Sequence, residues 1–391
     1  MRLIAALVVI LAGLTAFVPN ASARTIKVGV IACFTGPFAH WGDTWKRVIT
    51  VFQEENGNKV GNDTIEIIYR DERGTDPAIP KRLAEELILQ DRIDVLAGFT
   101  LTPSALAVAD VITEAKMPAV IFNAATHFIT RKSPMFTRVS ATLDASMVPL
   151  VGFAAKNGIK SGMIVVTDYT PGIEAAKTYN AEFAKNGIKQ VGEIKMPLAT
   201  KDFAVYIEKV IETKPEGMFV FLPAGSPSIT FVKTAGDRGL MKGGTRIFAL
   251  GEFGEQDLQS FGDVAIGANS AFYYSQAHDS DLNRKFVASM KKKFPQNEVD
   301  FISVIAWDGM HVIYEMAKRT GGKFGPDAIA QVKGMAWESP RGPMSIDPKE
   351  RDAIQNIYVR RVEKGPDGKL INKEIETIPN VKDPWKEANP E

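Results

Sequence analysis

The chain has 391 residues, of which 45% are hydrophobic and 24% are charged, with 47 Lys and Arg against 46 Asp and Glu. This length is typical of two domains, and the composition excludes a largely disordered protein. With a formal net charge of +1 and interleaved signs, the chain has no basic stripe, so we expect no nucleic-acid partner. The single cysteine excludes an intrachain disulfide and a cysteine-rich zinc site.

The first 23 residues have the pattern of a secretory signal peptide. Met1 and Arg2 form a short basic start, residues 3–18 are apolar, and Ala21-Ser22-Ala23 supplies the small residues that a signal peptidase requires. The apolar run is shorter than the roughly 20 residues that span a membrane. We therefore predict cleavage before Arg24 and a mature chain outside the cytoplasm.

From residue 25 onwards, short apolar strands alternate with longer helical patterns. In the first unit we predict strands at 26–32, 65–69, 94–98 and 118–122, and helices at 43–56, 77–90 and 103–115. Strands connected through helices in this way form a parallel sheet with right-handed crossovers and helices on both faces.

The same pattern then repeats. We predict helices at 144–157, 173–186, 201–213 and 226–238, and strands at 162–167, 190–196, 217–222 and 246–250. Two wound sheets indicate two lobes. The remainder, with helices at 281–292, 301–318 and 327–332 and a hairpin-like segment at 343–362, is too short for a third domain. We expect it to complete the two sheets, so the chain must cross between the lobes more than once.

No enzyme signature is present in the sequence. The chain lacks G-x-G-x-x-G after its first strand, G-x-x-x-x-G-K-[ST], G-x-S-x-G and H-E-x-x-H. Its four histidines, at positions 40, 127, 278 and 311, offer no dense metal cluster. Asp71 and Glu72 are adjacent on a strand and point to opposite faces, so we interpret them as surface charges. We predict no enzyme activity, no catalytic residue, no metal site and no cofactor.

Small and hydroxylic residues follow two of the predicted strands. Thr102 and Pro103 form a strong helix start after strand 94–98, with Thr102 in the N-cap position. Asn123-Ala124-Ala125-Thr126 follows strand 118–122. Open parallel sheets bind ligands at this edge, and a helix N-terminus suits a carboxylate. The alternative is that both threonines only cap helices.

Read in order, these segments resemble the periplasmic leucine/isoleucine/valine-binding protein family. The resemblance covers nearly the whole mature chain. It rests on the order and approximate spacing of Thr35-Gly36-Pro37, Trp41-Gly42, Thr75-Asp76-Pro77, Gly98 to Ser104, Asn123 to Thr126, Asp168 to Gly172, Gly251 to Gly254 and Arg341 to Asp347.

The resemblance implies an α/β fold of two doubly wound parallel-sheet lobes joined by three crossovers, the type I periplasmic binding protein fold. We expect residues 24–143 and 275–340 in the first lobe, and residues 144–274 and 341–391 in the second. Thr102 and Thr126 would hold a ligand carboxylate, helped by Ala124, and Trp41 would pack on the rest of the ligand. The full set of expected ligand-binding residues is Trp41, Phe99, Thr100, Leu101, Thr102, Asn123, Ala124, Ala125, Thr126, Asp168, Tyr169, Pro171, Gly225, Ser226, Glu252 and Phe253.

Two departures from the family pattern bear on the ligand. Pro171 stands where amino-acid binders often have Tyr, and the acid that faces the ligand ammonium aligns best with Phe253, leaving Glu252 one place away. A buried ammonium without a partner costs several kcal/mol, so these departures weaken the amino-acid assignment. Trp41, Phe99, Tyr169 and Phe253 favour an aromatic or bulky apolar carboxylate instead. Asp168 or Glu252 could still pair with an ammonium.

We therefore expect a monomeric periplasmic protein that binds a small carboxylate between its lobes and delivers it to the membrane permease of an ABC importer. The resemblance leaves two other readings open, branched-chain amino acid binding and a sensory protein that docks on a receptor. A secreted hydrolase is disfavoured, because no nucleophile can be paired with a base.

Overall fold

The structure, a computed structural model, describes residues 23–390 of the 391-residue chain. The predicted signal peptide, residues 1–23, lies outside the described residues except for Ala23. Within this described range, no helix is both long and apolar enough to cross a membrane.

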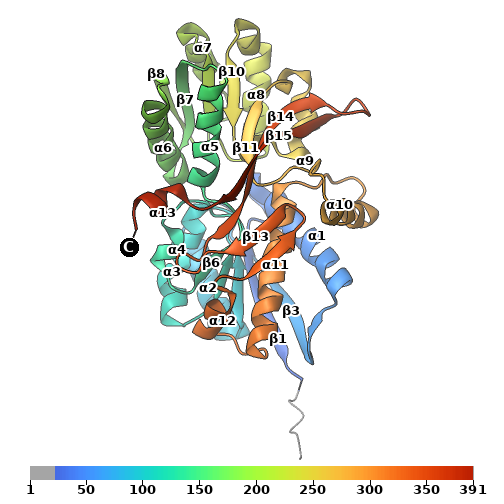
Figure 1. Cartoon of the computed structure of the whole chain (residues 1–391). Coiled ribbons are helices and arrows are strands. Elements are labelled where there is room, and N and C mark those ends of the chain that lie inside the picture. Colours follow the sequence, from blue (N-terminus) through green and yellow to red (C-terminus); the bar gives the residue numbers. More distant parts are fainter. Residues whose placement is uncertain (1–22, 391) are drawn as a thin grey trace, which may run out of the picture.

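The first of two β-sheets occupies the lower half of the molecule in Figure 1. Its spatial order is β2-β3-β1-β4-β5-β6, and only β2, at the edge beside β3, runs antiparallel to its neighbour. Val28, Val30 and Ile31 are fully buried on β1, because helices cover both faces of the sheet. The strands are β1 (Thr25–Ala32), β2 (Lys59–Val60), β3 (Asp63–Asp71), β4 (Val95–Gly98), β5 (Ala119–Ile121) and β6 (Phe136–Arg138).

Seven helices accompany this sheet in the described part of the chain, and together they make the first lobe. Among them, α11 packs along α1, where Phe52 meets Trp307 edge to face with ring centroids 4.9 Å apart. The helices are α1 (Ala39–Asn56), α2 (Ala78–Glu86), α3 (Thr102–Glu114), α4 (Ile129–Lys132), α10 (Asp281–Lys293), α11 (Phe301–Thr320) and α12 (Pro326–Val332).

The second sheet is mixed; strands β7 to β11 lie in the upper half of Figure 1, and the sheet extends through β14 to β13 in the lower half. Strands β8-β7-β9-β10-β11 are parallel, whereas β14 pairs antiparallel with β11, β13 and β15, and β12 pairs antiparallel with β13. The expected wound parallel sheet is therefore extended by antiparallel strands. The strands are β7 (Ser161–Asp168), β8 (Lys189–Pro197), β9 (Gly217–Phe221), β10 (Arg246–Ala249), β11 (Asn269–Phe272), β12 (Ala336–Ser339), β13 (Gly342–Ile346), β14 (Ala353–Lys364) and β15 (Leu370–Val381).

A second set of helices packs against this sheet and completes the second lobe. Phe203, Val232 and Leu258, from three parts of this helical layer, are buried in one apolar core with residues of the sheet. The helices are α5 (Leu143–Lys156), α6 (Thr170–Asn186), α7 (Ala204–Thr213), α8 (Ser226–Asp237) and α9 (Glu255–Phe261).

Three passages of chain join the lobes. The first leads from β6 to α5, and the second from β11 to α10 and α11, which pack against α1. The third runs through the hairpin of β12 and β13 into the long strand β14; Arg341 in this hairpin donates to the carbonyl of Val139 at 2.6 Å and to Asp308 at 2.8 Å. We keep the lobe boundaries expected from the sequence, near residues 143, 274 and 340, as a proposal.

After β15 the chain ends in the short helix α13 (Pro384–Ala388), which packs against α5 and lies beside α4 in Figure 1. The ring of Trp385 stacks on His127 with centroids 3.9 Å apart. The buried Lys386 ammonium donates to Thr130, and it lies 2.6 Å from an Asp352 carboxylate oxygen. The end of the described chain thus bridges the junction between the two lobes.

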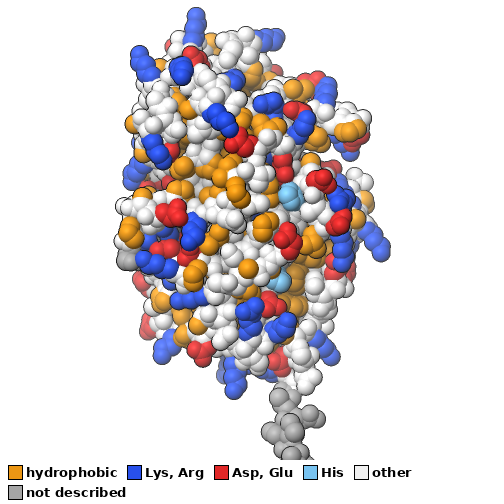
Figure 2. Space-filling view, in the orientation of Figure 1, with side chains coloured by type: hydrophobic (Ala, Val, Ile, Leu, Met, Phe, Trp, Pro, Cys, Tyr) orange, Lys and Arg blue, Asp and Glu red, His pale blue; other side chains and the backbone are white. Residues whose placement is uncertain are grey.

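The surface carries charges of both signs on both lobes. On the face in Figure 2, Lys and Arg side chains are interspersed with Asp and Glu, in keeping with the formal net charge of +1.

Candidate ligand-binding site

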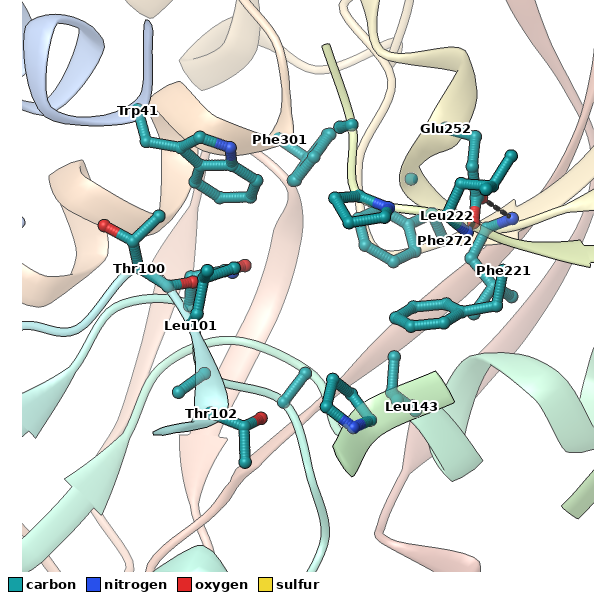
Figure 3. A pocket seen from close by; sticks show the side chains of 18 of the residues that line it. Trp41, Thr100, Leu101, Thr102, Leu143, Phe221, Leu222, Glu252, Phe272 and Phe301 are labelled. Atoms are coloured by element: carbon teal, nitrogen blue, oxygen red, sulfur yellow. Dashed lines mark hydrogen bonds between the residues drawn. The ribbon is translucent and has the colours of Figure 1, made fainter. Parts of the chain in front are cut away.

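A cavity of about 590 Å³, part of it open to solvent, lies between the lobes at the carboxyl ends of both sheets (Figure 3). Ligands of open α/β sheets bind at this same edge. The lining residues are Trp41, Thr100, Leu101, Thr102, Asn123, Ala124, Ala125, Leu143, Tyr169, Pro171, Phe221, Leu222, Pro223, Ala224, Leu250, Gly251, Glu252, Phe272 and Phe301.

Most residues expected from the sequence come together in this lining. They are Trp41, Thr100, Leu101, Thr102, Asn123, Ala124, Ala125, Tyr169, Pro171 and Glu252. They reach the cavity because Trp41 lies in the first turn of α1, which follows β1, and the others lie in the segments that follow β4, β5, β7 and β10, at the carboxyl ends of the strands.

The wall from the first lobe is built on the loop between β4 and α3. Gly98 has φ +105°, and a Cβ there would lie 2.3 Å from the carbonyl oxygen of Ile31, so the tight exit from β4 requires glycine. The helix begins at Thr102, one residue earlier than expected, and Thr102 is not its N-cap. Leu101 occupies that position, because its backbone is extended and its carbonyl accepts the N–H groups of Ser104 and Ala105.

The Thr102 hydroxyl is bonded to another hydroxyl rather than to a helix-capping N–H group. Its Oγ1 lies 2.9 Å from the Oγ1 of Thr126, and both side chains are buried. A hydroxyl group can accept one hydrogen bond while it donates another. When Thr126 donates to Thr102, the O–H group of Thr102 can therefore donate into the cavity. The interpretation of Thr102 as a helix-capping side chain is therefore wrong.

A buried carboxyl group supports the neighbouring Thr100. Glu72 Oε1 accepts the Thr100 N–H at 3.1 Å, and the Cys33 N–H donates to Thr100 Oγ1 at 3.1 Å. Glu72 is fully buried, so its interpretation as a surface charge is wrong: the chain turns inward at the end of β3. Burial raises the pKa of Glu72 and favours its neutral form, which suits a position beneath an anion site.

A buried arginine lies under the loop after β5, and the sequence analysis did not identify it. Arg138, the last residue of β6, donates to the carbonyl oxygens of Ala124 and Thr126 at 3.0 and 2.8 Å. Its guanidinium also pairs with Asp352 at 2.7 Å. It holds the loop in shape from behind. The strand that carries it has only three residues, too few for a recognisable alternation.

Aromatic side chains form the sides of the cavity. Trp41 meets Phe301 edge to face at 5.5 Å, Phe301 meets Phe272 at 4.8 Å, and Tyr169 lies nearly parallel to Phe221 at 6.3 Å. Sequence reasoning missed Phe221, Phe272 and Phe301. Phe221 ends a correctly placed strand and could have been found from that position, whereas β11, which ends at Phe272, was not predicted.

Glu252 lies on the wall opposite Thr100 and Thr102 in Figure 3. It is 2% exposed, and its two oxygens accept the N–H groups of Leu222 at 2.8 Å and Leu250 at 2.5 Å. Burial raises the pKa of Glu252 to about 7, because desolvation penalises the carboxylate more than these bonds stabilise it.

The other expected residues lie outside the lining. Phe99 packs on Phe136 with centroids 6.1 Å apart, and Phe253 packs on Phe261 in the core of the second lobe. Thr126 lies behind Thr102, and Asp168 is exposed at the end of β7.

Gly225 packs against His40 of the first lobe, and Ser226 lines a second interlobe groove. A Cβ at Gly225 would be 2.6 Å from the His40 ring, so this glycine allows the loop after β9 to approach α1 closely. Ser226 lines the groove together with Phe38 and Arg73.

The lining residues can bind a small molecule, but they are not arranged as a metal site. Within residues 23–390, no cluster of three or more His, Cys, Asp and Glu side chains is placed to hold a metal ion. The cavity has hydroxyl groups at one end, aromatic side chains along its sides and one acidic side chain, Glu252, at the other end. It suits a flat, mainly apolar anion.

Comparison with known proteins gives relatives over almost the whole chain. Residues 25–368 match a family described as periplasmic binding protein. A Leu/Ile/Val-binding protein homologue of Brucella melitensis is 44% identical over 371 residues, which are 94% of this chain and 95% of that protein.

Two solved structures with the same identity carry ligands. A solute-binding protein of an ABC transporter from Rhodopseudomonas palustris BisB5, in complex with 3,4-dihydroxybenzoic acid, is 44% identical with a TM-score of 0.89, covering 93% of this chain and 99% of that one. Another from R. palustris, in complex with 4-hydroxybenzoate, is 44% identical with a TM-score of 0.90, covering 92% and 99%.

Proposed function

Since this chain belongs to the periplasmic binding protein family, whose members bind solutes and are not enzymes, we propose that it binds an aromatic carboxylate and delivers it to an ABC importer. The observation that carries the proposal is the cavity itself, with the hydroxyl of Thr102 at one end and aromatic side chains along its length. The hydroxybenzoate complexes of the R. palustris proteins support the same class of ligand.

The carboxylate would bind at the first-lobe wall. The hydroxyls of Thr100 and Thr102 are donors there. At the start of α3 the backbone N–H group of Thr102 is a further donor, because Pro103 has no N–H group and those of Ser104 and Ala105 already bond to the carbonyl of Leu101. The ring would then lie among Trp41, Phe221 and Phe301. The indole Nε1 of Trp41 is buried without a hydrogen-bond partner among the described residues, so it is a further donor for the ligand.

Branched-chain amino acids are the second candidate, because the Brucella relative is named a Leu/Ile/Val-binding protein homologue. The lining argues against them. Glu252 is the acidic side chain of the lining, and it is across the cavity from Thr100 and Thr102. An ammonium beside a carboxylate held by these threonines would lack an anionic partner, at a cost of several kcal/mol.

The location and the partner follow from the same assignment. The mature chain acts in the periplasm after cleavage of the predicted signal peptide, residues 1–23, and hands its ligand to a membrane permease. It works as a monomer, because one chain supplies a complete cavity. Ligand binding shifts the lobes toward the closed arrangement through contacts made with both walls.

A thermal-shift panel tests the proposal. The protein is unfolded and refolded to remove any bound ligand, then mixed with benzoates, phenylpropanoids or aliphatic amino acids. A ligand at 100 times its dissociation constant should stabilise the folded protein by about 2.7 kcal/mol. We expect shifts from aromatic acids. Shifts from leucine, isoleucine or valine alone would contradict the proposal.

A further inference from the structure

The hydroxyl groups of the cavity and its one carboxyl group lie on opposite walls, and aromatic side chains line the space between these walls. In Figure 3, Thr100 and Thr102 lie on the left below Trp41, Glu252 lies on the right beside Phe272, and Phe301 lies between the two sides. An α-amino acid carries its carboxylate and its ammonium on one carbon. These two groups therefore cannot contact the threonine wall and Glu252 at the same time. An aromatic acid with a polar substituent on the far side of its ring can do so.

Glu252 has hydrogen-bonding capacity that the protein does not use. A carboxylate can accept about four hydrogen bonds, and the two that this one receives come from the N–H groups of Leu222 and Leu250. Arg360, the cation whose charge acts on Glu252, has its ion-pair contact with Glu255 instead, at 4.0 Å. A carboxylate buried in this way gains from any donor that a ligand brings.

The charged and titratable groups that face Glu252 are Arg360, Tyr169 and Tyr179. Arg360 donates instead to the carbonyl oxygens of Leu250 and Tyr274 and to Ser270. Tyr179 donates to the carbonyl oxygen of Val220 at 3.2 Å, and burial raises the pKa of both tyrosines, so both stay neutral near pH 7. These neighbours leave Glu252 available to the cavity.

We propose that Glu252 accepts a hydrogen bond from a ring hydroxyl opposite the ligand carboxylate, so that the site selects hydroxylated aromatic acids over unsubstituted ones. This inference rests on the proposed function and assigns a specificity role to one residue of the same site. A hydrogen bond to a charged acceptor supports a preference of about tenfold to a hundredfold, because an analogue without the hydroxyl leaves the remaining acceptor positions of the buried carboxylate unfilled.

The preference should depend on pH. The pKa of Glu252 is raised to about 7, so near and below this pH the side chain can take up a proton when benzoate, which brings no donor, is bound. Above pH 7 the same ligand leaves a bare carboxylate, whereas a hydroxyl donor still satisfies it. The ratio of affinities, 4-hydroxybenzoate over benzoate, should therefore rise between pH 6 and pH 8.

Calorimetry with 4-hydroxybenzoate and benzoate at pH 6 and pH 8 tests this, using the wild type, Glu252→Gln, Glu252→Leu and the control Glu255→Gln. Glu255 is a buried acid with a raised pKa that does not line the cavity. We expect the wild type and the control to prefer 4-hydroxybenzoate at least tenfold at pH 8. Glu252→Leu should lose the preference. Glu252→Gln should keep a preference that is equal at both pH values, because its amide does not titrate.

Two results would overturn the inference and leave the proposed function standing: equal affinities for both ligands in the wild type, or an unchanged preference in Glu252→Leu. Binding of neither ligand to the wild type would overturn both proposals. Should Glu252→Leu fail to fold, the pH dependence of Glu252→Gln decides, since a preference that still rises with pH would contradict the role of Glu252.

Discussion

At the residue scale, the anion-binding wall depends on groups that lie behind the cavity as well as in it. Thr126 contacts Thr102, Glu72 holds the backbone of Thr100, and Arg138 holds the loop after β5. These three side chains are buried, and each satisfies a polar group of a cavity loop. The loops are therefore held in shape before any ligand arrives, which reduces the ordering cost of binding.

Replacing Thr102 by Ala should weaken binding of the aromatic acid about tenfold or more. The lost bond is charge-assisted and desolvated, and such bonds contribute roughly 1.5–3 kcal/mol. Thr102→Ser should restore affinity, and Thr126→Ala should act through Thr102, with a smaller loss. Calorimetry measures the affinities and thermal unfolding the stability of the apo protein. Unchanged affinity with lowered apo stability would mean that the hydroxyl is only structural.

The sequence predicts site residues well where they follow a recognisable strand, and poorly elsewhere. Thr100, Thr102 and Ala125 come directly after apolar runs that are strands, so their place at the sheet edge could be inferred. Phe301 enters from the start of α11, far along the chain, and only the packing of α11 on α1 brings it to Trp41. Glu72 looked like a surface charge because strand alternation says nothing about a chain that turns inward.

At the element scale, the wound strands and helices and the hairpin-like segment at 343–362 were predicted, whereas β6, β11, β12 and β15 were not. Helix α1 was expected at 43–56 and begins at Ala39, because the 3₁₀ turn Gly36–Phe38 leads directly into it. Strands β6 and β11 have only three and four residues. The polar strand β15 is held by its antiparallel partner β14, a long-range pairing that local periodicity does not reveal.

The C-terminal helix α13 should contribute to stability although its sequence reads as a polar tail. Trp385→Ala removes a ring stacked on His127 and contacted by Arg131 at 5.5 Å. We expect the free energy of unfolding to fall by about 1–3 kcal/mol. Ligand affinity should change little, since Trp385 does not line the cavity.

Urea unfolding of Trp385→Ala beside Trp385→Phe, which keeps an aromatic ring, measures this effect. Equal stability of the Ala variant and the wild type would show that α13 adds nothing to the junction of the lobes.

At the scale of the whole molecule, the second lobe contacts helix α1 of the first lobe at two places. Gln256 on α9 donates to Thr44 Oγ1 on α1 at 2.9 Å, and His40 lies against Gly225. These contacts join elements whose sheets are separate, so they are the contacts that opening of the lobes would break. The structure is consistent with a closed arrangement around the cavity.

The pH dependence of stability follows from buried carboxyl groups in both lobes. Burial raises the pKa of Glu252 and Asp383 to about 7 and that of Asp257 to about 6. In the unfolded chain such groups ionise near pH 4, so between about pH 4 and pH 7 the folded state binds more protons. By linkage, their contribution is fully present below pH 4 and is lost as the pH rises through 6–7.

We therefore expect a larger free energy of unfolding at pH 5.5 than at pH 8. The opposite sign applies to Glu350, whose pKa the hydrogen-bonded Arg131 lowers to about 2; its contribution is present above its ordinary pKa and is lost as the pH falls through about 2. Urea unfolding at the two pH values, with Glu252→Gln and Asp383→Asn to reduce the slope, measures the effect. A stability that rises from pH 5.5 to pH 8 would refute it.

A direct comparison of an aromatic acid with an aliphatic amino acid as ligands is the sharpest test of the proposed function. Calorimetric titration of refolded, ligand-free protein with 4-hydroxybenzoate, and separately with leucine, compares the two candidates on the same sample. We expect one molecule of 4-hydroxybenzoate to bind per chain and leucine to give no binding heat. Saturable binding of leucine, isoleucine or valine, with no binding of any aromatic acid, would contradict the account.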